Sequence, residues 1–252
     1  MIDCHTHPLA HTGGKYTLDR LRPFVAEAVR KGLKGLAFTD HEWYKDEIDP
    51  GAVEELRQEY PQVKILLGLE IDYEPGREEE IRRIIEAKPY DYVIGSVHDI
   101  GGWPFDHPDY LSGYRQWKIN SLYEKYFATL AQAVDSGLFQ LVGHLDLIKV
   151  FGYFYQGDLL PVVKPVLEKI RQQGMAVELN TNGFYKPVRE MYPSPSILRQ
   201  CLALDIPVVL SSDAHAAHEV GRDFARGRRI LQEIGYQKIS WIEGRKILSR
   251  SW

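Results

Sequence analysis

The chain has 252 residues, of which 44% are hydrophobic and 26% charged, enough for one α/β domain or two smaller ones. Its net charge is −4 and its basic residues form no stripe along the sequence, so nucleic acid is not expected as a partner. There is no basic-then-apolar leader and no apolar run near ~18 residues, so neither secretion nor membrane spanning is expected. Cys4 and Cys201 lie far apart and outside any CxxC motif, which favours reduced thiols and a cytoplasmic protein.

Short apolar runs alternate with amphipathic segments along the chain. The predicted strands span residues 1–4, 35–38, 63–69, 92–96, 141–143, 176–179 and 208–211. The predicted helices span residues 18–31, 52–59, 78–87, 114–136, 161–173, 196–204 and 218–234. Thr17 and Gly32 are placed to cap the two ends of the first helix, as Pro161 and Gly174 are for the fifth.

This alternation predicts parallel βαβ units. Seven such units without a dinucleotide-binding glycine fingerprint favour a barrel over an open sheet, and barrel chemistry lies at the carboxyl ends of the strands. All seven predicted strands are followed there by polar side chains, namely His5, His7, Asp40, His41, Glu70, Asp72, His98, His144, Asp146, Asn180, Asn182, Asp213 and His215.

Several of these groups have the spacing of metal ligands. His5 and His7 are two residues apart at a strand end, so both rings point to one side and reach one cation. Asp3 is placed to orient one of those rings. Glu70 lies in an apolar stretch, where an unpaired carboxylate is costly and needs a cation or a strong partner.

Each motif also has an ordinary explanation. The histidine pair can be a surface feature, Asp40 and Asp213 can cap helices, Glu70 can form a buried salt bridge, and His98 or His144 can be a hydrogen-bonded core histidine. All of these explanations must hold at once, whereas ionisable groups that converge on one barrel mouth repel each other or stay unsatisfied without metal. A multinuclear site with Glu70 as a bridge between cations removes the conflict.

Two loops carry further candidate residues. Residues 178–193 carry Lys186 and Arg189, cations of the types that bind phosphate oxygens, although solvated loop cations are also common. The aromatic-rich stretch 103–117 is long for a βα loop and is either a lid or packing for the outer wall. His107 lies in this stretch and receives no role.

In these motifs the chain resembles the polymerase-and-histidinol-phosphatase (PHP) superfamily. The motifs occur in order as His5-Thr6-His7, Thr39-Asp40-His41, Gly68-Leu69-Glu70, His98, His144 and Asp213-Ala214-His215. Residues 143–149 and 178–193 are similar to the histidinol-phosphatase branch. The resemblance implies one domain over residues 1–252 that folds as a distorted, TIM-like (β/α)7 barrel with a trinuclear metal site at the carboxyl ends of its strands.

The resemblance also implies the ligands of two or three divalent transition-metal ions, for which imidazole and carboxylate donors suit Zn, Mn and Fe alike. One ion would be held by His5, His7, Glu70 and Asp213, the second by Glu70, His98 and His144, and the third by His11, His41 and His215.

The expected reaction is hydrolysis of a small phosphate monoester, L-histidinol phosphate, in histidine biosynthesis. A metal-bridging hydroxide would attack phosphorus in line, with Glu70 and Asp213 holding the ions. Arg189 and Lys186 would neutralise the phosphoryl oxygens, and His218 or a metal-bound water would protonate the leaving group. The remaining expected substrate contacts are Asn180, Lys149 and Glu190, and the acids proposed for the substrate's nitrogen groups are Asp72, Asp146 and Glu190.

Three alternatives remain open at this point. The same hydrolase chemistry can act on another ester, such as a phosphotyrosine peptide. An amidohydrolase would also open with His-x-His, but it needs a metal-bridging lysine and a lone late aspartate, whereas this chain has Glu70 early and an Asp-x-His pair late. The third alternative is a non-catalytic PHP metal-binding module. The sequence does not indicate an oligomeric state.

Overall fold

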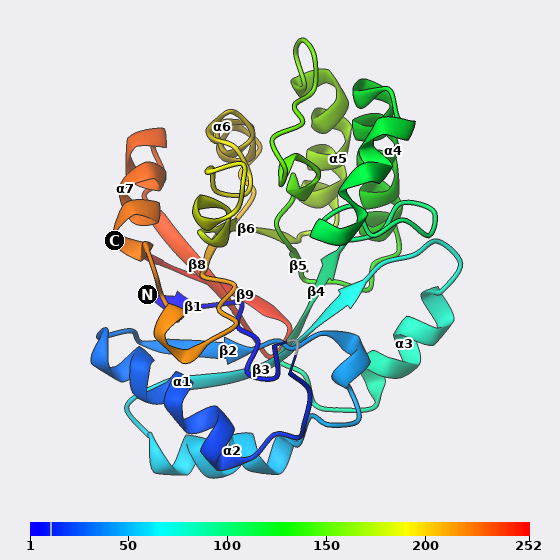
Figure 1. The fold of residues 1–252 in the computed structure, drawn as a ribbon. Helices are drawn as coiled ribbons and strands as arrows, with labels where there is room; N and C mark the ends of the chain where they lie inside the picture. The colour runs from blue at the N-terminus through cyan, green and yellow to red at the C-terminus, as the bar shows by residue number, and fades with distance from the viewer. Residues whose placement is uncertain (11) are drawn as a thin grey trace.

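The computed structural model describes residues 1–10 and 12–252. These residues form one sheet surrounded by helices (Figure 1). The strands run in the order β1 to β9, parallel from β1 to β8 and antiparallel between β8 and β9. Their bounds are β1 (Ile2–Asp3), β2 (Gly35–Phe38), β3 (Lys64–Asp72), β4 (Tyr92–Ser96), β5 (Leu141–Val142), β6 (Ala176–Asn180), β7 (Val208–Ser211), β8 (Lys238–Glu243) and β9 (Lys246–Ser251).

The sheet closes into a barrel because β1 also lies beside β7. The amide of Cys4 donates to the carbonyl of Leu210 at 3.1 Å, and the amide of His7 donates to that of Ala214 at 2.8 Å. A parallel bridge between Thr6 and Ala214 continues the contact. The predicted distorted barrel of seven parallel strands is therefore confirmed.

Helices follow the strands and cover the outside of the barrel (Figure 1). They are α1 (Leu18–Arg30), α2 (Pro50–Glu59), α3 (Glu78–Glu86), α4 (Ile119–Asp135), α5 (Leu160–Gln172), α6 (Pro195–Ala203) and α7 (Phe224–Ile234). In α3, Ile81, Ile84 and Ile85 recur at helical spacing and are buried, which pins one face of the helix to the barrel. None of the helices in the described part of the chain is long and apolar enough to cross a membrane.

The barrel interior has two layers. Alternate residues of a strand face the same side, so Leu66 and Glu70 of β3 both point inward, as do Ala176 and Glu178 of β6. The lower layer is a small apolar cluster that includes Leu66, Ala176 and Ile242 of β8. The upper layer, at the carboxyl ends of the strands, is polar, and there Glu70 and Glu178 are both buried.

Three local features differ from the sequence-based expectation. The β8–β9 hairpin was not predicted. The helix expected over residues 114–136 is divided into a 3-10 segment (Pro108–Gln116) and α4, because Trp117 between them is extended at φ −113° and ψ 141°. The helix expected over 218–234 is reduced to a 3-10 turn (Ala217–Glu219) and α7, because Gly221 and Asp223 take left-handed φ values of 64° and 56°.

Candidate metal centre

Glu70 lies at the centre of the polar layer, with histidines around both oxygens of its carboxylate. Its Oε2 lies 3.0 to 3.4 Å from nitrogens of His5, His7 and His41. Its Oε1 lies 3.0 Å from Nε2 of His144 and 3.7 Å from Nε2 of His98. This one carboxylate therefore joins donors from opposite sides of the barrel mouth.

A serine hydroxyl on the neighbouring strand, and a glycine beside it, fix the position of the Glu70 carboxylate. The hydroxyl of Ser96 on β4 donates to Oε1 of Glu70 at 2.6 Å. Ser96 can approach from β4 because Gly143 follows β5 without a side chain, and a Cβ at Gly143 would lie 2.3 Å from the Ser96 hydroxyl. A glycine at this position thus leaves room for the contact that holds the carboxylate.

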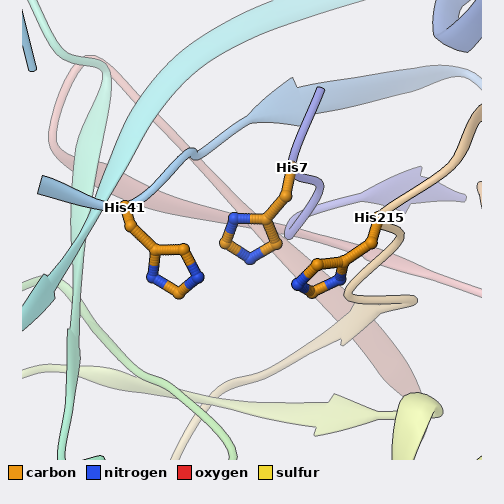
Figure 2. Close-up of side chains that lie close together, drawn as sticks. All are labelled: His7, His41 and His215. Atoms are coloured by element: carbon orange, nitrogen blue, oxygen red, sulfur yellow. The ribbon is translucent and has the colours of Figure 1, made fainter. Parts of the chain in front are cut away.

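Donor atoms gather in three sets, and within each set they lie within 4.8 Å of one another. They are His7, His41 and His215; His5, His7 and Glu70; and Glu70, His98 and His144. Figure 2 shows the first set, in which the rings of His41 and His215 flank that of His7 with centroids 4.4 and 4.6 Å away. Asp213 adds a further donor, since its Oδ1 lies 3.3 Å from Nε2 of His7.

The buried histidines carry nitrogens whose pairing is incomplete without cations. Nε2 of His5, both ring nitrogens of His7 and Nδ1 of His144 form no hydrogen bond within the described part of the chain. Burial, and then the neighbouring rings of His41 and His215, lower the pKa of His7 well below its usual value, so this ring is neutral. Imidazoles beside carboxylates are the donors that divalent transition metals bind, so these residues fit a multinuclear centre.

The charge of Glu70 agrees with this arrangement. Burial opposes its ionisation, but the surrounding histidines, led by His5 and His41, outweigh burial and hold the pKa of Glu70 well below its usual value. Asp213 behaves in the same way, because His5 and His7 offset its burial and keep its pKa low. Both side chains are therefore carboxylates ready to bind cations.

Glu178, for which no role was predicted, holds two of the histidines in position. Its buried carboxylate accepts hydrogen bonds from Nδ1 of His5 at 3.0 Å, from the amide of His144 at 2.6 Å and from Nδ2 of Asn180 at 2.9 Å. The bond between Nδ1 of His5 and Glu178 leaves Nε2 of His5 as the nitrogen that faces Glu70. The available signal was an acid inside the apolar strand Ala176–Asn180, the same signal that pointed to Glu70.

Other acids near the centre have fixed partners. Asp3, expected to orient an imidazole ring, instead accepts from the amides of Ser212 at 2.9 Å and Gly221 at 2.7 Å, and so ties β1 to the segment after β7. Asp72 forms the ring contact that Asp3 lacks, because its carboxylate bonds to Nδ1 of His98.

The metal-donor residues open into a cavity of about 460 Å³. Donors such as Glu70 and Asp213 form its floor, and loop residues that follow β4, β5 and β6 form its walls. Of the residues expected to contact substrate, Lys186 and Asp72 line this cavity. Arg189 and His218 are exposed and are not among its lining residues in the described part of the chain.

Lys149 has a different place from the one expected. It is only 3% exposed, and its ammonium donates to Glu190 at 2.6 Å and to the carbonyl of Met191 at 2.9 Å, with Asp146 also at 2.9 Å. Three acceptors use all three N–H groups, so Lys149 and Glu190 clamp two loops together, and the contact of either residue with substrate stays a prediction. Asn180 likewise donates to Glu178 and to Asp213 within the polar layer. His11 lies outside the described residues.

Comparison with known proteins agrees with this architecture. The family model for the PHP domain matches residues 3–182. The chain belongs to the PHP family. A probable histidinol-phosphatase of Deinococcus radiodurans is 38% identical over 96% of both chains. The histidinol-phosphatase of Bacillus subtilis is 28% identical, with 87% of this chain and 95% of that protein covered.

Solved structures of this family share the fold. The histidinol phosphate phosphatase of Lactococcus lactis, solved with zinc, L-histidinol and phosphate, superposes with a TM-score of 0.80 over 98% of both chains at 22% identity. A putative histidinol phosphatase of Listeria monocytogenes superposes with a TM-score of 0.71 over 90% of this chain and 99% of that one, at 19% identity. The predicted membership of this family is confirmed.

Proposed function

We propose that residues 1–252 form one metal-dependent phosphomonoesterase domain that hydrolyses L-histidinol phosphate to L-histidinol and inorganic phosphate. The observation that carries this proposal is the set of three donor groups, two of which share Glu70, at the floor of one cavity. Its support from relatives is the similarity to a probable histidinol-phosphatase over 96% of the chain.

Each donor group would hold one divalent ion. Glu70 would join the ion beside His5 and His7 to the ion beside His98 and His144, while His41 and His215 would hold a third. Bound ions of this kind lower the pKa of water to give a nucleophile near neutral pH and neutralise phosphoryl oxygens.

The side chains around the donors would orient the ester. Lys186 is the lysine that lines the cavity, and its ammonium suits a phosphoryl oxygen. Asn182 also lines the cavity, and its side-chain amide donates to Asp213 at 3.1 Å, which keeps that carboxylate directed at His7.

The deciding experiment measures phosphate release by purified protein whose metal content is determined by mass spectrometry. We expect kcat/KM for L-histidinol phosphate to exceed that for phosphotyrosine and for phenyl phosphate. A higher kcat/KM for an aryl phosphate would keep the phosphatase and reject the substrate. Metal-loaded protein with no turnover of any of the three esters would reject catalysis and favour a metal-binding module.

A further inference from the structure

The cavity has two chemically different walls. Carboxylates gather on the wall formed after β3 and β4, whereas Lys186 stands on the wall formed after β6. The acidic wall carries Asp72, Glu74, Asp99 and Asp106. A ligand that fits both walls has an anionic end and a cationic end.

Three of these four carboxylates have an evident local role. Asp72 bonds to His98, and Asp99 accepts from the amide of Gly102 at 2.5 Å within its own loop. Glu74 pairs with Arg77 at 3.9 Å, although its side chain is 56% accessible. Asp106 is half-buried, and within residues 1–10 and 12–252 it forms neither an ion pair nor a side-chain hydrogen bond.

The residue before Asp106 is anchored in the core. The preceding residue, Phe105, is fully buried, and its ring meets that of Tyr126 edge to face at 5.6 Å. Asp106 and His98 both line the cavity. Asp106 is thus a half-buried acid in the cavity wall, next to an anchored residue.

A second unpaired group lies in the same cavity. Tyr192 is 1% exposed and lines the cavity, yet its hydroxyl has no hydrogen-bond partner in the described part of the chain. Its backbone is pinned on both sides by Asn180, at 2.7 and 3.1 Å. A buried polar atom without a partner marks a place for a ligand or an ordered water.

We propose that Asp106, with Tyr192 from the segment after β6, forms the subsite for the amine-bearing end of the substrate, while Lys186 and the metal donors take the phosphoryl end. Asp106 accepts N–H bonds from the ammonium group, and the hydroxyl of Tyr192 provides a further hydrogen bond to the same end of the molecule. This inference rests on the proposed function, because it assigns residues to the part of L-histidinol phosphate that is not hydrolysed.

The test combines two protein variants with two substrates. Asp106→Asn and Tyr192→Phe are compared with wild type on L-histidinol phosphate and on imidazolylpropyl phosphate, which lacks the amine. In wild type, removal of the amine should lower kcat/KM by roughly 10- to 100-fold, the scale of a hydrogen bond to a charged group. In Asp106→Asn the same removal should change kcat/KM by less than about 3-fold, because the partner of the amine is already gone.

Matched controls separate recognition from stability. Asp109→Asn removes the same charge from the same loop at a side chain that is 84% exposed. Tyr126→Phe removes a buried hydroxyl that, within the described residues, also has no hydrogen-bond partner and does not line the cavity. Both controls should keep the wild-type preference for the amine-bearing ester, and Tyr192→Phe should lower kcat/KM for that ester by roughly 10-fold.

Failure of the subsite and failure of the proposed function give different results. Wild type that hydrolyses both esters equally well would overturn the subsite whether or not the variants fold, and so would Asp106→Asn that keeps the full preference. If wild type hydrolyses neither ester, the proposed function fails, and calorimetry with L-histidinol then decides the subsite. The subsite is supported if L-histidinol binds wild type about 10-fold or more tightly than it binds Asp106→Asn. Equal affinities for the two proteins overturn the subsite.

Discussion

Replacing Lys149 by methionine should destabilise the protein rather than weaken substrate binding. The Lys149 ammonium is surrounded by Asp146, Glu190 and the carbonyl of Met191, all within 2.9 Å. Methionine keeps the length and apolar character of the side chain but removes the cation. The carboxylate of Asp146, 1% exposed, then loses its charged partner, although the amide of Ser194 still donates to it at 2.9 Å.

The size of the effect follows from the burial of Asp146. Removal of one partner of a buried ion pair costs roughly 3–5 kcal/mol, because the remaining charge has neither water nor a counterion. Glu190 adds little to this cost, since its side chain is 35% exposed and water can solvate it. At roughly 2–4 °C per kcal/mol for a chain of this size, the melting temperature should fall by about 6–20 °C.

The assay is denaturant and thermal unfolding at saturating metal, with Lys149→Met compared with the double variant Lys149→Met/Asp146→Asn. The double variant should regain part of the lost free energy of unfolding, because the unpaired buried charge is gone. A loss below about 1 kcal/mol in the single variant, together with a raised KM, would refute this reasoning and restore Lys149 as a substrate contact.

Four further predictions address the metal centre and the cavity. Chelation should abolish activity and lower the melting temperature, because ions that bind only the folded chain stabilise it; full activity in metal-free protein would contradict the centre. Glu70→Gln should lose metal and at least ~100-fold in kcat/KM, measured by mass spectrometry and kinetics. Glu178→Gln should weaken metal binding by roughly 10- to 100-fold in competition with a chelator, through its bond to His5. Lys186→Ala should lower kcat/KM by roughly 10- to 100-fold and Arg189→Ala by less than about 3-fold; the opposite order would favour the sequence-based emphasis on Arg189.

The barrel and the position of Glu70 could be predicted from sequence because both depend on local patterns. An apolar strand followed by a polar group is visible in the chain, and seven repetitions define where the strand ends meet. Glu70 stands out because an acid inside an apolar run has few stable environments. Glu178 carried the same signal but lay beside the more conspicuous loop cations.

The roles of loop residues could not be predicted in the same way. Lys149 and Arg189 are both cations near strand ends, yet one is buried against three acceptors and the other is exposed. That difference arises from contacts between loops that are distant in sequence. Asp106 was overlooked for the same reason, since its importance depends on the anchoring of Phe105 and on which neighbouring acids are already paired.

Most metal donors stand at strand ends, whereas Asp106 and Lys186 stand in the loops above them. Strand ends are held by the hydrogen bonds of the barrel, but loops tolerate changes of length and sequence. Under the proposed function, selection can therefore alter which ester enters the cavity while the candidate metal donors stay intact. Exchange of the segment between β4 and α4 with that of a relative is accordingly a direct route to a phosphatase with a new substrate range.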